Sequence, residues 1–318
     1  ELPRLIHQRL LAPPAPPVMG LVELFAHLAQ IRARRHLLYS GLQQNPEAVI
    51  GIDAPDFHLP VLAAARRARH LAVGLVAPQV WAWRAGRARS VAQQLDLLLC
   101  LFPFEPDLFL PFGLDARWIG HPAVELPPSR PEAETLALFP GSRPAERRLL
   151  LPVYRQVAEA FGASHTLLAL PPGVPAPPGP WEPVSSAEAQ RRAGRALSKS
   201  GTVTLELALA GVPTVVAHRV PPLTWWVGKL LVRGIRHLAL PNILLDRAHA
   251  QPTGPQAPIP EYLQHFEPAT LVRALRAVSP PPSDRLRQLL APPDSRSVAE
   301  RAAVAIVERL SLRRSARR

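Results

Sequence analysis

Two carboxylates follow an apolar run in the segment 51–57, Gly-Ile-Asp-Ala-Pro-Asp-Phe. Asp53 comes just after the run 48–52, and Pro55 restricts the backbone of the turn. A carboxylate at the end of a parallel strand can act as the general base that deprotonates a hydroxyl group. Asp53 or Asp56 could instead cap the next helix, and the segment by itself favours neither interpretation.

A second segment, Pro-Gly-Ser-Arg at 140–143, lies between an apolar run and a helical pattern. This order predicts a strand, a turn of small residues that includes Ser142, and a helix start. Backbone N–H groups and the helix dipole favour an anion at such a place, and Arg143 would add a bidentate donor for phosphate. An ordinary turn with a surface arginine has the same short pattern and stays open as an alternative.

A third segment, Ser-Gly-Thr-Val-Thr-Leu-Glu at 200–206, also predicts a helix N-terminus. Ser200, Gly201 and Thr202 would let the backbone come close to a diphosphate. Glu206 lies one turn further and could accept hydrogen bonds from ribose hydroxyls. A buried carboxylate is costly without such partners, although a solvated glutamate is the alternative.

The elements that must position these residues are short strands alternating with helices. Apolar runs of strand length occur at 48–52, 71–76, 95–102, 135–139, 166–170, 195–198 and 212–217. Helical patterns occur at 18–38, 59–69, 144–161, 201–211 and 295–311. This alternation predicts an α/β fold with parallel sheets covered by helices.

A segment rich in Pro and Glu at 122–134 interrupts the alternation and predicts a linker. We therefore expect two Rossmann-like domains that face each other across a cleft. The N-terminal domain would cover 1–127 and the C-terminal domain 134–294, followed by a helix and a basic tail over 295–318.

The composition argues against several classes of protein. The formal net charge is +13, from 37 Lys and Arg against 24 Asp and Glu, which attracts phosphates or anionic lipid heads. No zinc finger, RNP-like motif or basic-region heptad accompanies that charge, so we expect no nucleic-acid partner. Cys100 is the only cysteine, which rules out an intrachain disulfide. No apolar run reaches the roughly 18 residues of a transmembrane helix, and a cytoplasmic setting fits best.

Eight short segments occur in an order that resembles the lipid-A-disaccharide synthase family. The similarity extends over roughly 18–275. Each segment is short, but the ordered set is specific: 51–57, 78–84, 101–105, 120–122, 140–143, 200–206, 240–242 and 260–264.

The resemblance implies a GT-B fold and an inverting transfer that needs neither metal nor cofactor. The donor would be UDP-2,3-diacylglucosamine, the acceptor 2,3-diacylglucosamine 1-phosphate (lipid X), and the products a β-1,6-linked disaccharide phosphate and UDP. It implies that Asp53 is the base, that Arg143 and the Leu-Pro-Asn asparagine, Asn242, matter for activity, and that Glu206 lies near the nucleotide. These assignments agree with the chemistry expected of the first three segments.

The resemblance also implies a peripheral enzyme on the cytoplasmic face of the inner membrane of a Gram-negative bacterium. The predicted helix over 18–31 has one apolar stripe, with Arg32, Arg34 and Arg35 directly after it. Such a helix suits binding to an anionic lipid surface. The family also suggests a homodimer.

The family pattern begins with a strand and a Gly-Glu-x-Ser-Gly-Asp loop that have no counterpart here. Because the chain starts at Glu1, we expect an N-terminal domain without its first strand, with an exposed apolar sheet edge. Two other functions stay open: another UDP-sugar enzyme of similar fold, or a non-catalytic, membrane-associated remnant of this family.

Overall fold

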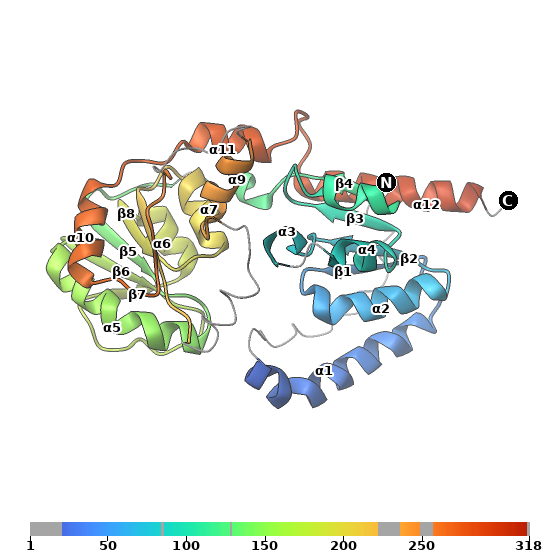
Figure 1. Ribbon diagram of the computed structural model, residues 1–318, viewed down its shortest axis with the longest axis horizontal. Coiled ribbons are helices and arrows are strands. Elements are labelled where there is room, and N and C mark those ends of the chain that lie inside the picture. Colours follow the sequence, from blue (N-terminus) through green and yellow to red (C-terminus); the bar gives the residue numbers. More distant parts are fainter. Residues whose placement is uncertain (1–20, 84–85, 128, 222–235, 249–256, 317–318) are drawn as a thin grey trace. The chain divides into compact units, whose positions relative to one another are not determined.

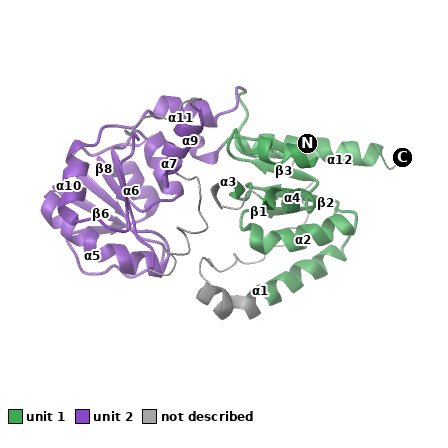
Figure 2. Cartoon of the chain, in the orientation of Figure 1, with its two compact units in different colours: residues 1–120, 294–318 green, residues 121–293 purple. Residues whose placement is uncertain are grey.

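The computed structural model describes residues 21–83, 86–127, 129–221, 236–248 and 257–316. At 21–30 and 82–83 the description covers the backbone alone. The chain divides into two compact units, 1–120 together with 294–318, and 121–293 (Figure 2). Each unit is built on its own parallel sheet.

The first unit contains a sheet of four parallel strands in the order β1-β2-β3-β4. The strands are β1 (Ala48–Ile52), β2 (Leu71–Leu75), β3 (Leu97–Cys100) and β4 (Asp115–Trp118). Within the described residues β1 is an edge strand, and the side chains of Ile50 and Ile52 are exposed.

Helices cover both faces of this sheet (Figure 1). On one face, α2 (Pro55–Arg67), α3 (Val80–Trp83) and α4 (Arg87–Ala92) pack against the strands, and α1 (Leu21–Leu42) packs on the outer side of α2. Two short 3-10 helices, η2 (Pro106–Leu108) and η3 (Leu110–Phe112), precede β4. No helix of the described residues is long and apolar enough to cross a bilayer.

The C-terminal helix α12 (Val298–Ser315) covers the other face. Val298, Ala302 and Ala305 are buried there with the inward side chains of β2 and β3. The sequence sets 295–318 apart as a third segment, whereas the structure joins this helix to the first unit. The reason is the stripe of small apolar residues on α12, which is buried against this face of the sheet.

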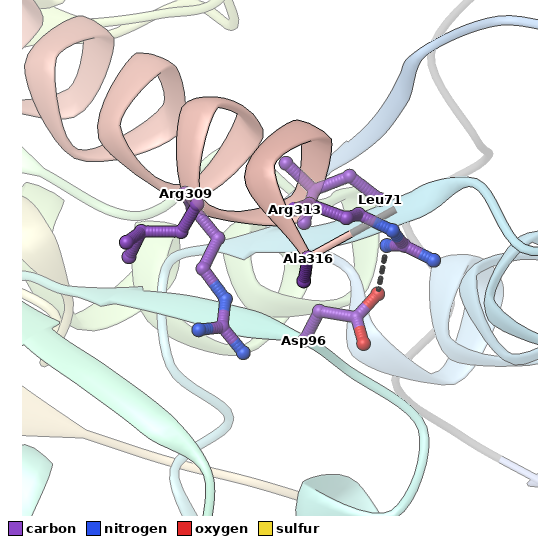
Figure 3. A pocket seen from close by; sticks show the side chains of 6 residues that line it. Leu71, Asp96, Arg309, Arg313 and Ala316 are labelled. Atoms are coloured by element: carbon purple, nitrogen blue, oxygen red, sulfur yellow. Dashed lines mark hydrogen bonds and ion pairs between the residues drawn. The ribbon is translucent and has the colours of Figure 1, made fainter. Parts of the chain in front are cut away.

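The C-terminal end of α12 borders a hollow at the amino ends of the strands (Figure 3). Asp96, just before β3, pairs there with Arg313 at 3.1 Å and with Arg66 of α2 at 3.1 Å. The Oδ2 atom of Asp96 also accepts the Ala72 N–H at 3.0 Å. These contacts fasten both α12 and α2 to the sheet.

The second unit contains six parallel strands in the order β10-β9-β8-β5-β6-β7. The strands are β5 (Thr135–Phe139), β6 (His165–Ala169), β7 (Glu182–Val184), β8 (Arg195–Ser198), β9 (Thr214–His218) and β10 (Glu261–Leu263). The chain crosses from β6 and β7 back to β8 on the other side of β5. As a result, β5, β8 and β9 lie side by side at the centre.

Helices α5 (Pro144–Phe161) and α10 (Pro268–Ala277) pack on one face of this sheet, around the fully buried Tyr154. The opposite face is covered by α6 (Ser186–Arg192) and α7 (Thr202–Leu209). Helices α9 (Leu240–Ala248) and α11 (Ser283–Leu290) pack beside α7, and η4 (Pro122–Glu125) also contacts it.

All seven predicted strands are present, with ends shifted by a few residues in some of them. The structure adds β4, β7 and β10, which are only three or four residues long and have no distinct apolar run. Helix α2 begins at Pro55 rather than at 59, because proline is well tolerated in the first turn of a helix.

Candidate active site

Asp53 lies directly after β1, and its backbone is in the left-handed region with a φ of 51°. Ala54 follows with a φ of 42°. Two consecutive non-glycine residues in this region cost on the order of 1–2 kcal/mol each. Two hydrogen bonds hold the turn: the Asp53 N–H donates to the Leu75 carbonyl at 2.9 Å, and the Asp53 carbonyl lies 2.9 Å from His58 Nδ1.

The two carboxylates of this segment have different surroundings. Asp56 Oδ1 pairs with Arg87 at 2.7 Å. Asp53 is exposed, and among the described residues no hydrogen bond or ion pair engages its carboxylate. Neither aspartate caps α2, whose N-cap residue is Ala54 with no side-chain hydrogen bond. The structure thus excludes the capping alternative and leaves the Asp53 carboxylate available.

A second strained residue lies at the end of the neighbouring strand. Val76, just after β2, has a φ of 75°, an outlier for a β-branched side chain. Its N–H donates to the Leu99 carbonyl at 3.0 Å. Strain of this kind clusters at functional sites, and here it marks the carboxyl edge of the first sheet.

The segments 78–84 and 101–105 meet around one buried carboxylate. Glu105 is 2% exposed, and its Oε2 atom accepts the N–H groups of Leu101 and Phe102, both at 3.1 Å. Trp81 donates from Nε1 to Glu105 Oε1 at 3.4 Å and packs edge-on against Phe104. These contacts give Trp81 a packing role.

In the second unit, Arg143 occupies the turn between β5 and α5. It is the N-cap residue of α5, and its Nη1 atom lies 3.1 Å from Glu146 Oε1. Gly141 has a φ of 100°, and a Cβ added there would lie 2.3 Å from Glu146 Oε2. Only glycine therefore fits beside the folded-back glutamate. Ser142 is exposed in the same turn.

A lysine from the next strand joins this pair. Lys199 follows β8, and its Nζ atom lies 2.8 Å from Glu146 Oε1. Burial raises the pKa of Glu146, but the hydrogen bond and charge of Lys199, together with the charge of Arg143, outweigh it and bring that pKa below its usual value. Glu146 is therefore ionised and shared between two cations.

His218, the last residue of β9, lies beside this group. Burial and then the charge of Lys199 lower its pKa to about 4, although Glu146 acts in the opposite direction. The imidazole is neutral at neutral pH. Within the described residues, His218 Nδ1 and Arg143 Nε are both buried without a hydrogen-bond partner.

Sequence reasoning missed Glu146, Lys199 and His218. The available signals were that Glu146 lies three residues after Arg143 and that Lys199 immediately precedes Ser200. Their convergence depends on β5, β8 and β9 being neighbours in the sheet.

The segment that begins α7 has mixed contacts. Ser200 Oγ donates to the Leu238 carbonyl at 2.7 Å. Gly201 has an extended backbone, with a φ of 167° and a ψ of −171°, and a Cβ added there would meet none of the described residues within 4 Å. Neither conformation nor packing requires a glycine here. Thr202 is the first residue of α7.

Glu206 lies one turn further along α7 and is half-buried. Its Oε2 atom accepts a 2.6 Å hydrogen bond from Gln190 Nε2 of α6. The carboxylate is therefore paired with an amide inside the unit rather than solvated.

Asn242 of α9 is 2% exposed, and its amide is bonded within the unit. Its Nδ2 atom donates to the Ile259 carbonyl at 2.8 Å and to Glu261 Oε1 at 2.6 Å, and its Oδ1 atom accepts the Ile259 N–H at 3.2 Å. The other carboxylate oxygen of Glu261 accepts the Leu238 N–H at 2.6 Å. Asn242 is thus linked through Glu261 and Leu238 to Ser200.

The structure brings Arg143, Ser142 and the segment 200–202 to the carboxyl edge of the second sheet, where ligands bind in such folds. Asp53 lies at the corresponding edge of the first sheet. Within the described residues, no group of three or more His, Cys, Asp or Glu side chains could hold a metal ion.

Comparison with known proteins gives the family. The sequence model of lipid-A-disaccharide synthetase matches residues 8–170 and 184–262. The chain belongs to this family. A lipid-A-disaccharide synthase of Rhodospirillum centenum is 36% identical in an alignment 307 residues long that covers 86% of this chain and 74% of that protein. The enzyme of the same name from Neisseria meningitidis serogroup B is 35% identical in an alignment 291 residues long that covers 81% of this chain and 73% of the relative.

A solved calicheamicin glycosyltransferase has a similar fold, with a TM-score of 0.51, 17% identity, and coverage of 93% of this chain and 83% of that one. Members of the lipid-A-disaccharide synthetase family are glycosyltransferases, and the fold is of the GT-B class. Both predictions from the sequence, the family and the α/β fold, are confirmed.

Proposed function

We propose that the chain transfers a 2,3-diacylglucosamine unit from UDP to the 6-hydroxyl of 2,3-diacylglucosamine 1-phosphate, with inversion at the anomeric carbon. The observation that carries this proposal is the pair of cations at the carboxyl edge of the second sheet, Arg143 and Lys199, beside the small-residue start of α7. Such an edge suits the diphosphate of a UDP-sugar.

The acceptor would bind to the first unit. Asp53 would take the proton of the acceptor 6-hydroxyl, and the resulting oxygen would attack the anomeric carbon from the face opposite the diphosphate. The Asp53 carboxylate is exposed and has no partner among the described residues, which supports this role. The strained turn supports it as well, because strain must be held by surrounding contacts and clusters at functional sites.

The nucleotide would bind to the second unit. As the bond between the anomeric carbon and the diphosphate oxygen breaks, its electron pair goes to UDP. Arg143 and the first backbone N–H groups of α7 would stabilise that charge. Gly201 supports a close approach, because none of the described residues lies within 4 Å of a Cβ placed there.

Glu206 and Asn242 would have different parts in binding. Glu206 would accept hydrogen bonds from the ribose hydroxyls. They would replace the hydrogen bond that Gln190 Nε2 donates to it. Asn242 would act indirectly, because its amide is bonded to Ile259 and Glu261 and orders the segment that receives the Ser200 hydroxyl.

The proposal includes peripheral binding to the cytoplasmic face of the inner membrane through the predicted helix over 18–31. Residues 18–20 and the side chains of 21–30 lie outside the described part of the chain. Of the flanking arginines, Arg35 donates from Nε to the Phe57 carbonyl at 3.2 Å and lies over the Phe57 ring. Arg35 therefore anchors α1 to α2, and Arg32, which is exposed, is the candidate for lipid contact. A homodimer stays a prediction.

The test is synthesis of the disaccharide from defined lipids. The chain is incubated with UDP-2,3-diacylglucosamine, with and without 2,3-diacylglucosamine 1-phosphate, and the lipids are analysed by mass spectrometry. We expect disaccharide 1-phosphate only when both lipids are present, in equal amount to the UDP released. UDP release that does not depend on the acceptor would contradict transfer and indicate hydrolysis.

A further inference from the structure

The end of three neighbouring strands in the second unit carries an unusual set of charges. Arg143 follows β5, Lys199 follows β8, and His218 ends β9. One carboxylate, Glu146, faces both cations through the same oxygen, at 3.1 Å from Arg143 and 2.8 Å from Lys199. With His218 neutral, two cations share one anion, and the group keeps one positive charge.

We propose that Lys199 and Arg143 form a two-cation site for a diphosphate group, and that Glu146 is an internal counter-ion which the ligand displaces from them. The inference deepens the proposed function, on which it rests for the identity of the ligand as a nucleoside diphosphate. Within that function it adds Lys199 as a binding residue and Glu146 as the counter-ion that the ligand displaces.

Burial shows why a counter-ion is needed. The side chains of Arg143, Lys199 and Glu146 are 26%, 16% and 14% exposed. Two cations held this close and this far from water would repel each other without an anion between them. Glu146 supplies that anion until a ligand takes its place.

Glu146 is also held by a contact that does not involve the two cationic side chains. Its Oε2 atom also accepts the backbone N–H of Arg143 at 3.4 Å, as part of the cap of α5. Gly141 provides the space, because any Cβ at that residue would collide with the same carboxylate oxygen. Glu146 can therefore release the cations and still keep a hydrogen bond.

The site also has an unused donor. Arg143 Nε is buried and has no acceptor within the described residues, and an unpaired buried donor is unfavourable. A phosphate oxygen placed between Arg143 and Lys199 would supply the missing acceptor.

The test is calorimetric titration of the full chain with UDP, uridine and inorganic diphosphate. We expect Lys199→Met to weaken binding of UDP and of diphosphate by about tenfold or more, with uridine unchanged and with Lys199→Arg close to wild type. The matched control is Arg148→Met, which removes one charge from an exposed side chain of the same helix, α5, and should change diphosphate binding by less than about twofold.

Glu146→Gln gives the sharper result. Removal of the competing carboxylate should tighten diphosphate binding by about threefold to tenfold, and the variant remains informative if Lys199→Met does not fold. Weaker binding by folded Glu146→Gln, or unchanged binding by folded Lys199→Met, would overturn the inference.

The same titrations separate this inference from the proposed function. Diphosphate binding that depends on Lys199, without any UDP binding, would support the two-cation site and contradict the UDP-sugar enzyme. UDP binding that does not change when Lys199 is replaced would contradict the two-cation site and would leave the UDP-sugar enzyme supported. A wild-type chain that binds neither ligand would contradict both.

Discussion

His58 Nδ1 lies 2.9 Å from the carbonyl oxygen of Asp53, so a side chain of α2 reaches back to the strained turn that precedes its own helix. On the other side of the turn, the Asp53 N–H donates to the Leu75 carbonyl of β2. These two contacts fix the backbone of Asp53 while its carboxylate stays exposed. His58 is therefore a positioning residue for the proposed base.

Replacement of His58 by alanine should lower turnover by about threefold to tenfold, the effect of one lost hydrogen bond on the geometry of the turn. The dissociation constant of UDP should not change, because His58 lies in the other unit. His58→Asn is the matched control, since its amide can donate from nearly the same place as Nδ1. Equal loss in both variants would show that the hydrogen bond is not what matters.

Asp53→Asn should reduce turnover by at least about a hundredfold, because an amide cannot take the hydroxyl proton. UDP affinity and thermal stability should stay near wild type, since no partner of the carboxylate is lost within the described residues. Asp56→Asn is the control in the same segment. It loses an ion pair with Arg87 in which Asp56 is 76% exposed, so its turnover should fall less than about twofold. Similar rates for the two variants would remove Asp53 as the base.

Asn242→Asp should lower the free energy of unfolding by about 2–4 kcal/mol, because it replaces a donor by a second carboxylate facing Glu261 and leaves the Ile259 carbonyl unpaired. UDP binding should weaken as well, through the link from Glu261 by Leu238 to Ser200. Urea unfolding and UDP titration measure the two effects. Asp246→Asn on the same helix is the control and should cost less than about 1 kcal/mol. Unchanged stability of Asn242→Asp would mean that the amide network is not structural.

The stability of the second unit should depend on pH through His121. Burial lowers the pKa of His121 to about 4, and its Nδ1 atom accepts the Ala123 N–H at 3.1 Å, which requires the neutral ring. The unfolded chain, with a pKa near 6.5, binds the proton more readily. The free energy of unfolding should therefore decrease as pH falls from about 6.5 towards 4, by on the order of 1–2 kcal/mol at pH 5.

His121→Asn should remove this part of the pH dependence. Asparagine is a good N-cap residue and can accept the Ala123 N–H without titrating, so stability at neutral pH should be nearly kept. Urea unfolding at pH 7 and pH 5 measures the difference. A pH dependence equal to that of wild type would show that other groups, such as His218, account for it.

Local patterns in the sequence predicted the segments that carry the proposed chemistry. The Pro-Gly-Ser-Arg turn could be recognised because a strand, a glycine and a helix start lie within a few residues of one another, and the structure has β5, Gly141 with its positive φ, and α5 at those places. The segment around Asp53 by itself left a general base and a helix cap equally open, and the resemblance favoured the base. The structure has since excluded capping as its alternative.

Contacts between distant segments could be found only in the tertiary structure. Lys199 contacts Glu146 because β8 lies beside β5 in the sheet. The hydrophobic pattern of a single segment does not indicate which strands are neighbours. Asn242 is bonded to Glu261 of β10, and α12 closes the first unit after the chain has completed the second. The sequence by itself determined the family, most of the strands and the turns, because these depend on neighbouring residues. The fold decided which charges share one site, because that depends on which strands lie side by side.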